Sequence, residues 1–135
     1  WKRRLNLDER VVLLPPLPQV QLWGLFARSA VSVSVTTHDG TPNTLLEAIA
    51  CGSFPVAGDL ESLREWITPG VNELLVEGHK ADSIAAAVVQ ALSSPQLLQQ
   101  AAEINRRLIA GRAEVQQMRL RLKEFYDRVV QRVKA

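Results

Sequence analysis

Residues 36–57 read TTHDGTPNTLLEAIACGSFPVA, and the order of residue types in this stretch predicts a turn, then a helix, then a strand. Asp39-Gly40 is a typical turn pair, and Thr41-Pro42 is typical of a helix N-cap followed by the first helical residue. Gly52 is typical of the position just past a helix end. The short apolar run at residues 54–57 then has the length and composition of a buried strand.

Strand and helix signals alternate through the first half of the chain. Short apolar, β-branched runs predict four strands, at residues 11–14, 31–35, 54–57 and 73–76. Helical patterns separate them, at residues 20–28, 43–51 and 62–67. Because the crossovers are long enough to return each strand in the same direction, we expect an α/β domain with a Rossmann-like parallel sheet of about four strands.

Three further helical patterns follow the last predicted strand and form a helical C-terminal tail, at about residues 81–92, 95–109 and 113–133. The last one carries an apolar stripe from Val115 to Val133, which we expect to pack on something. Residues 101–135 hold nine Lys or Arg against four acidic residues, whereas residues 1–100 have a net charge of −3. We favour a solvated helix face for this basic tail over contact with phosphates or an anionic membrane surface.

The composition is that of one globular domain. A chain of 135 residues with 47% hydrophobic and 22% charged residues is neither disordered nor fibrous. Its longest apolar runs, of about six or seven residues, are too short to cross a bilayer, which takes about twenty. The single cysteine, Cys51, cannot form an internal disulfide, so we expect a reducing cytoplasmic location, with the inner face of the membrane as a second place.

The start of the helix predicted at residues 43–51 faces the carboxyl end of a parallel strand, where open α/β sheets bind ligands. Because Pro42 has no N–H, the unpaired backbone donors fall on Asn43, Thr44 and Leu45. These donors and the positive end of the helix dipole suit a phosphate group. Any strand-to-helix junction exposes such donors, however, and most of them bind only water.

Glu47 is the one polar side chain between Leu45 and Cys51, so an otherwise apolar helix carries a carboxylate that needs a partner. A salt bridge or a cap to a neighbouring loop is one interpretation, and a grip on ligand hydroxyls is the other. Asp39, eight positions earlier, is either a turn residue or a second acid across the same helix start. Two such carboxylates beside a phosphate site suit a sugar nucleotide, and His38 either points into that site or lies on the surface.

At these residues the sequence resembles the retaining GT-B glycosyltransferases of family 4, or group 1, which carry an E-x7-E motif. The family pattern joins a Glu-Gly-rich loop to a Leu-Glu-Ala-Met-Ala-Cys-Gly helix and a Pro-Val-Val-Ala strand. Asp39-Gly40 and residues 46–52 and 55–57 match it in order and spacing. The similarity extends over residues 11–30 and 63–76, and it implies the C-terminal, donor-binding domain of that fold.

The resemblance implies a role for each part of the loop and helix. Glu47 would bind the donor ribose, and Asp39 and Gly40 would hold the transferred sugar. The backbone after Gly40 would take the pyrophosphate, through Thr41, Asn43, Thr44 and Leu45. The base would lie on the loop after the first strand, which is formed by Leu14, Pro15, Pro16 and Leu17.

The chain departs from the family pattern at several positions. Asp39 stands where the family has a longer glutamate, and Pro15 stands where a glycine is usual. Glu61 and Ser62 occupy the place of paired glycines, and Glu65 matches a recurrent glutamate.

The function implied is transfer of a sugar from a UDP-, GDP- or ADP-linked donor to a hydroxyl of a sugar, lipid or polysaccharide, with retention and without a metal or cofactor. The family's acceptor domain, its first strands and a basic Arg and Lys pair have no counterpart in the 135 residues. We therefore expect one partial domain with no complete catalytic site, inactive alone. We also expect the 11–14 strand either to pair with the 31–35 strand or to swap into a strand-swapped dimer.

Two other classes of function stay open from the residues themselves. One is a non-catalytic α/β module that binds a nucleotide or a protein partner, although the sequence has no Gly-x-Gly-x-x-Gly and no P-loop motif. The other is a structural domain that docks through its last helix. Nothing in the pattern indicates a nucleic-acid partner.

Overall fold

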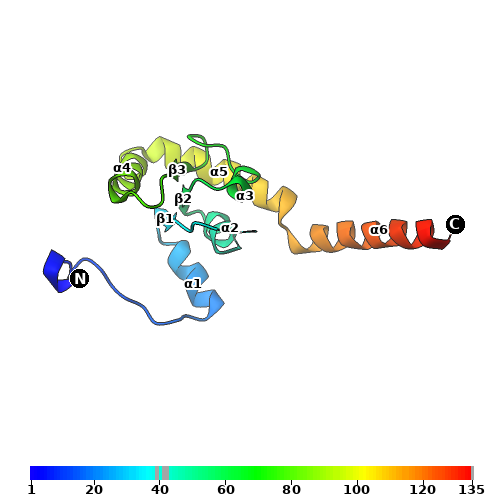
Figure 1. Ribbon diagram of the computed structural model, residues 1–135, viewed down its shortest axis with the longest axis horizontal. Helices are drawn as coiled ribbons and strands as arrows, with labels where there is room; N and C mark the ends of the chain where they lie inside the picture. Colours follow the sequence, from blue (N-terminus) through cyan, green and yellow to red (C-terminus); the bar gives the residue numbers. More distant parts are fainter. Residues whose placement is uncertain (39, 41–42, 135) are drawn as a thin grey trace.

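The structure is a computed structural model that describes residues 1–38, 40 and 43–134 (Figure 1). Strands and helices alternate in its centre, in the order α1 (Gln19–Phe26), β1 (Val31–Ser34), α2 (Asn43–Ala50), β2 (Phe54–Gly58), α3 (Glu61–Arg64) and β3 (Leu74–Val76). A 3-10 turn, η1 (Arg3–Leu5), precedes them, and three long helices follow, α4 (Ala81–Leu92), α5 (Pro95–Arg112) and α6 (Val115–Lys134). The α/β class and the helical tail are therefore confirmed.

The three strands form a parallel sheet in the order β1-β2-β3. Every residue of the central strand β2 is buried, because both of its faces are covered. The N–H of Phe54 points toward β1 and donates to the carbonyl of Ala30. Backbone groups of successive strand residues point to opposite sides, so the backbone nitrogen of Pro55 points toward β3. There the β3 ladder begins only opposite Val56, and the missing N–H of Pro55 leaves no gap in it.

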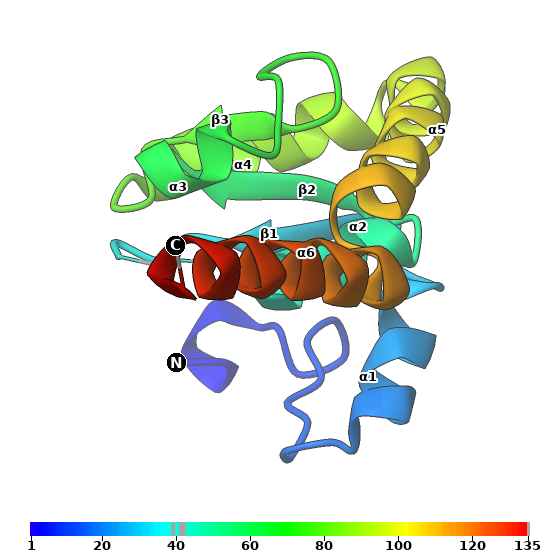
Figure 2. The same ribbon diagram turned by 90° about the vertical axis from the view of Figure 1, so that its right-hand side faces the viewer.

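Two apolar clusters cover the two faces of the sheet. On one face, Phe54, Val56 and Val76 pack against alanines of α4 and α5, namely Ala87, Ala91 and Ala101. On the other face, Ala57 packs against α2 and the α3 region, through Leu45, Leu63 and Ile67. The small alanines let the helices approach closely, and Figure 2 shows the strands lengthwise and side by side, with α4 running behind them.

The strand predicted at residues 11–14 does not form, so the sheet has three strands in the described chain rather than about four. Val12 and Leu13 are 76% and 68% exposed, on an arm that extends beyond α1 (Figure 1). A strand is stabilised only by a neighbour's hydrogen bonds, and the stiff prolines Pro15, Pro16 and Pro18 lead the chain from this run directly into α1. Direct pairing with β1 is therefore wrong, whereas a strand-swapped dimer stays a prediction.

The helix α6 projects away from the body of the molecule (Figure 1). Its apolar stripe, which we expected to be packed, is exposed: Met118, Leu122 and Phe125 are all about half accessible to solvent. The stripe contacts little but itself, as in the edge-to-face pair of Phe125 and Tyr126, because α6 leaves the body soon after α5 ends. Among the described helices, none combines the length and apolar character needed to span a bilayer.

Buried polar groups lie at the start of β3. Asn72 accepts the N–H of Thr68 at 2.7 Å and donates its amide to Asn105 Oδ1 at 2.6 Å, while Asn105 donates back to the carbonyl of Asn72 at 3.1 Å. These bonds tie α5 to the loop before β3. The neighbouring Glu73 is fully buried, and neither of its carboxylate oxygens has a hydrogen-bond partner in the structure.

Burial, with a smaller contribution from the nearby Asp59 charge, raises the pKa of Glu73 from 4.5 to about 8. Folded protein therefore holds a proton that the unfolded chain releases between those values, and folding stability falls as pH rises through this window. The loss is on the order of 5 kcal/mol over the window, at about 1.4 kcal/mol per pKa unit.

Replacing Glu73 with Gln removes the titration, so only the unmodified chain should lose stability as pH rises. We therefore expect the free energy of unfolding of Glu73→Gln to increase relative to that of the unmodified chain from pH 5 to pH 8. Urea denaturation at each pH measures this difference. The exposed Glu9→Gln is the control and should show no such trend. Parallel pH profiles for the Glu73→Gln and unmodified chains would contradict the assignment.

Candidate functional site

The candidate phosphate site lies where α2 begins, after the carboxyl end of β1. Asn43 and Thr44 are exposed at this helix start, and the side chain of Leu45 is buried in the core. Two predicted contacts, Asp39 and Thr41, lie outside the described residues. Gly40 is exposed, with open space around it.

Glu47 is half-buried on α2, one turn after Asn43, and it has the partner that the sequence required. The side-chain amide of Gln19 donates from Nε2 to Oε1 of Glu47 at 2.8 Å. The partner is thus a neutral amide from α1, which is neither the salt bridge nor the loop cap that the sequence suggested.

Glu47 and Asn43 open into the same hollow, of about 550 Å³. Its walls come from α1, α2 and the junction of α5 with α6, and they are mostly apolar: Trp23, Leu46, Ala50, Cys51, Ile109, Ala113 and Val115. Burial, and then the charge of Glu47, raise the pKa of the Cys51 thiol, so this cysteine stays protonated at neutral pH. The hollow thus combines apolar walls with one carboxylate and one amide.

The predicted base-binding loop lies on another face of α1. Leu14 and Leu17 line a second hollow of about 550 Å³ together with α1 residues that include Gln21 and Leu25. Pro15 is exposed and is not among the residues that line it.

A third hollow, of about 360 Å³, brings together residues that the sequence named separately. His38 lies in it from the loop after β1, and Glu61, Ser62 and Glu65 line it from α3 and its end. Next to it, Arg64 and Asp59 form a bidentate ion pair, with N–O distances of 2.8 and 2.7 Å. These side chains lie at the carboxyl end of the sheet, where the chain leaves β1 and β2.

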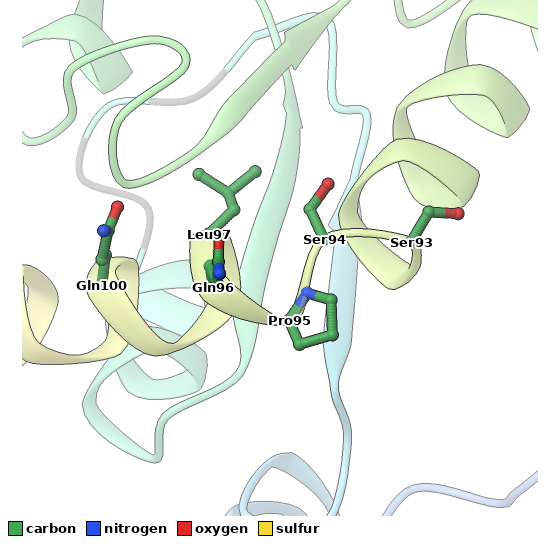
Figure 3. A pocket seen from close by; sticks show the side chains of 6 residues that line it. All are labelled: Ser93, Ser94, Pro95, Gln96, Leu97 and Gln100. Atoms are coloured by element: carbon green, nitrogen blue, oxygen red, sulfur yellow. The ribbon is translucent and has the colours of Figure 1, made fainter.

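A larger hollow, of about 670 Å³, lies at the junction of α4 and α5 (Figure 3). Its lining, Ser93, Ser94, Pro95, Gln96, Leu97 and Gln100, carries no charged group. The helix α4 follows the carboxyl end of β3 and runs back along the sheet, so its junction with α5 lies at the amino ends of the strands. Ligands of open α/β sheets bind at the carboxyl ends, and we therefore do not place the ligand in this hollow.

Gln19 and Trp23 are the site residues that the sequence missed. Both come from α1, and no local pattern singles out a glutamine that follows a proline or a tryptophan in an apolar helix. Within the described ranges, no three His, Cys, Asp or Glu side chains are grouped to hold a metal ion. The arrangement offers helix-start donors, one carboxylate and apolar walls, which suit an anionic ligand that also carries hydroxyl groups.

The family model for group 1 glycosyl transferases matches residues 1–108. The D-inositol 3-phosphate glycosyltransferases of Kribbella flavida and Thermobispora bispora are 31% and 30% identical to this chain over 93 and 94 residues. These matches cover 69% and 70% of this chain and 22% of each relative.

Two solved structures share the fold at 20% sequence identity. Sucrose-phosphate synthase from Thermosynechococcus elongatus has a TM-score of 0.85 and covers 96% of this chain, and Anabaena Alr3699/HepE in complex with UDP and glucose has the same score over 93%. The chain spans about a third of the length of these structures and about a fifth of the curated relatives.

Gly58, at the end of β2, packs closely against the backbone of the loop that contains Thr36 and His38. A Cβ at this position would lie 3.0 Å from the backbone oxygen of Thr36, where two backbones approach each other. We expect Gly58→Ala to lower the free energy of unfolding by about 1–3 kcal/mol and to move the loop after β1. Urea denaturation measures the first effect, and the His38 ring signals in an NMR spectrum report the second.

The matched control is Gly111→Ala in α5, where an added Cβ meets nothing within 4 Å. This change should be neutral or slightly stabilising, because alanine favours a helix over glycine. Equal effects of the two substitutions would show that the approach of Gly58 to Thr36 does not constrain the loop.

Proposed function

The chain belongs to the group 1 glycosyl transferases, and from this premise we propose that it is the donor-binding part of an enzyme that transfers a sugar from a nucleoside diphosphate sugar to a hydroxyl acceptor. The transfer proceeds with retention and without a metal or cofactor. The acceptor is held by a separate N-terminal domain of the full-length enzyme, outside these 135 residues.

The observation that carries the proposal is that Asn43, the first residue of α2, and Glu47, one turn later, line one hollow that runs along the side of this helix. The N–H groups of that helix start bind the pyrophosphate, and the carboxylate accepts hydrogen bonds from the ribose hydroxyls. The UDP bound to the Anabaena structural neighbour supports a nucleotide donor.

With the pyrophosphate at the start of α2 and the ribose at Glu47, the other two parts of the donor, the base and the sugar, can be placed. The base lies toward the loop with Leu14 and Leu17, and the transferred sugar lies toward Gly40 and the hollow beside His38, with Asp39 as the acid that binds it. As the sugar leaves, negative charge grows on the diphosphate, and the helix-start donors of α2 stabilise it. Basic residues from outside this chain supply the rest of that stabilisation.

Binding tests this proposal directly. In titration calorimetry with UDP, GDP and ADP, we expect at least one nucleotide to bind, and Glu47→Gln to weaken it by about tenfold to a hundredfold. That range follows from the loss of a hydrogen bond to a charged acceptor, about 1.5–3 kcal/mol.

Glu124→Gln is the control, because it removes an exposed carboxylate on α6, the helix that projects away from the body of the molecule (Figure 1), and Glu124 does not line the hollow. It should bind like the unmodified chain. Failure of all three nucleotides to bind, or equal binding by the Glu47→Gln and Glu124→Gln chains, would reject the proposal.

A further inference from the structure

Gln19 is the first residue of α1, and its amide reaches across to α2, 28 residues further along the chain, to hydrogen-bond Glu47. We propose that Gln19 is a positioning residue, which holds the Glu47 carboxylate in the orientation that receives the ribose hydroxyls of the donor. This inference rests on the proposed function, because it assigns Gln19 a role only if Glu47 binds ribose.

The position of Gln19 is set by a stiff segment of backbone. The ring of Pro18 fixes its φ angle, which is −56° here, and its carbonyl accepts the N–H groups of Gln21 and Leu22 at 2.9 and 3.1 Å. Gln19 therefore lies inside a closed first turn of helix. The backbone that carries the Gln19 side chain is therefore already ordered when the side chain hydrogen-bonds Glu47. Ligand binding does not have to order this part of the main chain.

The chemistry of the pair leaves the carboxylate able to bind. A carboxylate has about four acceptor sites on two oxygens, and the Gln19 amide occupies one of them, on Oε1. A neutral amide also leaves the negative charge of Glu47 uncompensated, whereas an arginine would hold both oxygens and neutralise them. Oε2 thus remains a charged acceptor for hydroxyl donors.

Without Gln19, the half-buried carboxylate is free to rotate, and ribose binding would have to order it. The opposite role is a latch, in which Gln19 occupies Glu47 and the nucleotide must displace it. The two roles predict opposite changes in affinity when the amide is removed, which makes them separable by experiment.

The test compares UDP with 2′,3′-dideoxy-UDP, which lacks the ribose hydroxyls, with the GDP and ADP pairs measured in parallel. We expect Gln19→Met, which keeps the side-chain length but has no amide, to weaken nucleotide binding by about threefold to tenfold. Binding of the dideoxy analogue should not change. Gln19→Glu places a second carboxylate against Glu47 and should weaken ribonucleotide binding further.

The control is Gln90→Met on α4, an exposed glutamine on a helix of the opposite face of the sheet, which should leave both affinities unchanged. Equal weakening of both ligands by Gln19→Met would indicate a merely structural role, and tighter UDP binding would indicate a latch; either result overturns the inference. The inference is also overturned if Gln19→Met leaves nucleotide binding unchanged while Glu47→Gln weakens it. That result would leave the proposed function intact. If no nucleotide binds at all, the proposed function fails first, and the role of Gln19 fails with it.

Discussion

Burial of both faces of β2 is the constraint on which the rest of the structure depends. The strand contributes Phe54 and Val56 to one apolar cluster and Ala57 to the other, and its backbone pairs with β1 and β3. Parallel sheets are stable when helices cover both of their faces, and β2 has this surrounding, with a parallel neighbour on each side. That arrangement brings the carboxyl ends of the strands together, and with them the loops that carry the candidate site.

The site residues come from segments that are distant in sequence. Glu47 is placed by α2, whose apolar face is held down by Leu45 and Ile49 in the core, so that the polar position faces the hollow. Its partner Gln19 is placed by a different helix, α1, which packs beside α2. Because Glu47 and Gln19 belong to separate helices, the distance between their side chains depends on how α1 and α2 pack, and neither helix sets it alone.

The sequence predicted the strands and helices well wherever local chemistry and tertiary packing favour the same outcome. It placed α4 at its observed bounds, Ala81–Leu92, and located β1, β2, β3 and α2 to within one or two residues. It was wrong at residues 11–14, because a β-branched run is a strand only where a neighbouring edge is within reach. It also gave no sign that Glu73, an ordinary surface type of residue, would be enclosed at the start of β3 while Asn72 found partners on α5.

By itself, the sequence determined the α/β class, the helix start at Asn43 and the isolated polar position at Glu47, because turn chemistry, proline placement and apolar periodicity are local properties. Only the tertiary structure decided what Glu47 meets, namely the amide of Gln19 and a hollow walled by four helices. It also decided that His38 would share a hollow with Glu61 and Glu65. Such contacts depend on how separate elements pack, and no pattern within a single segment encodes them.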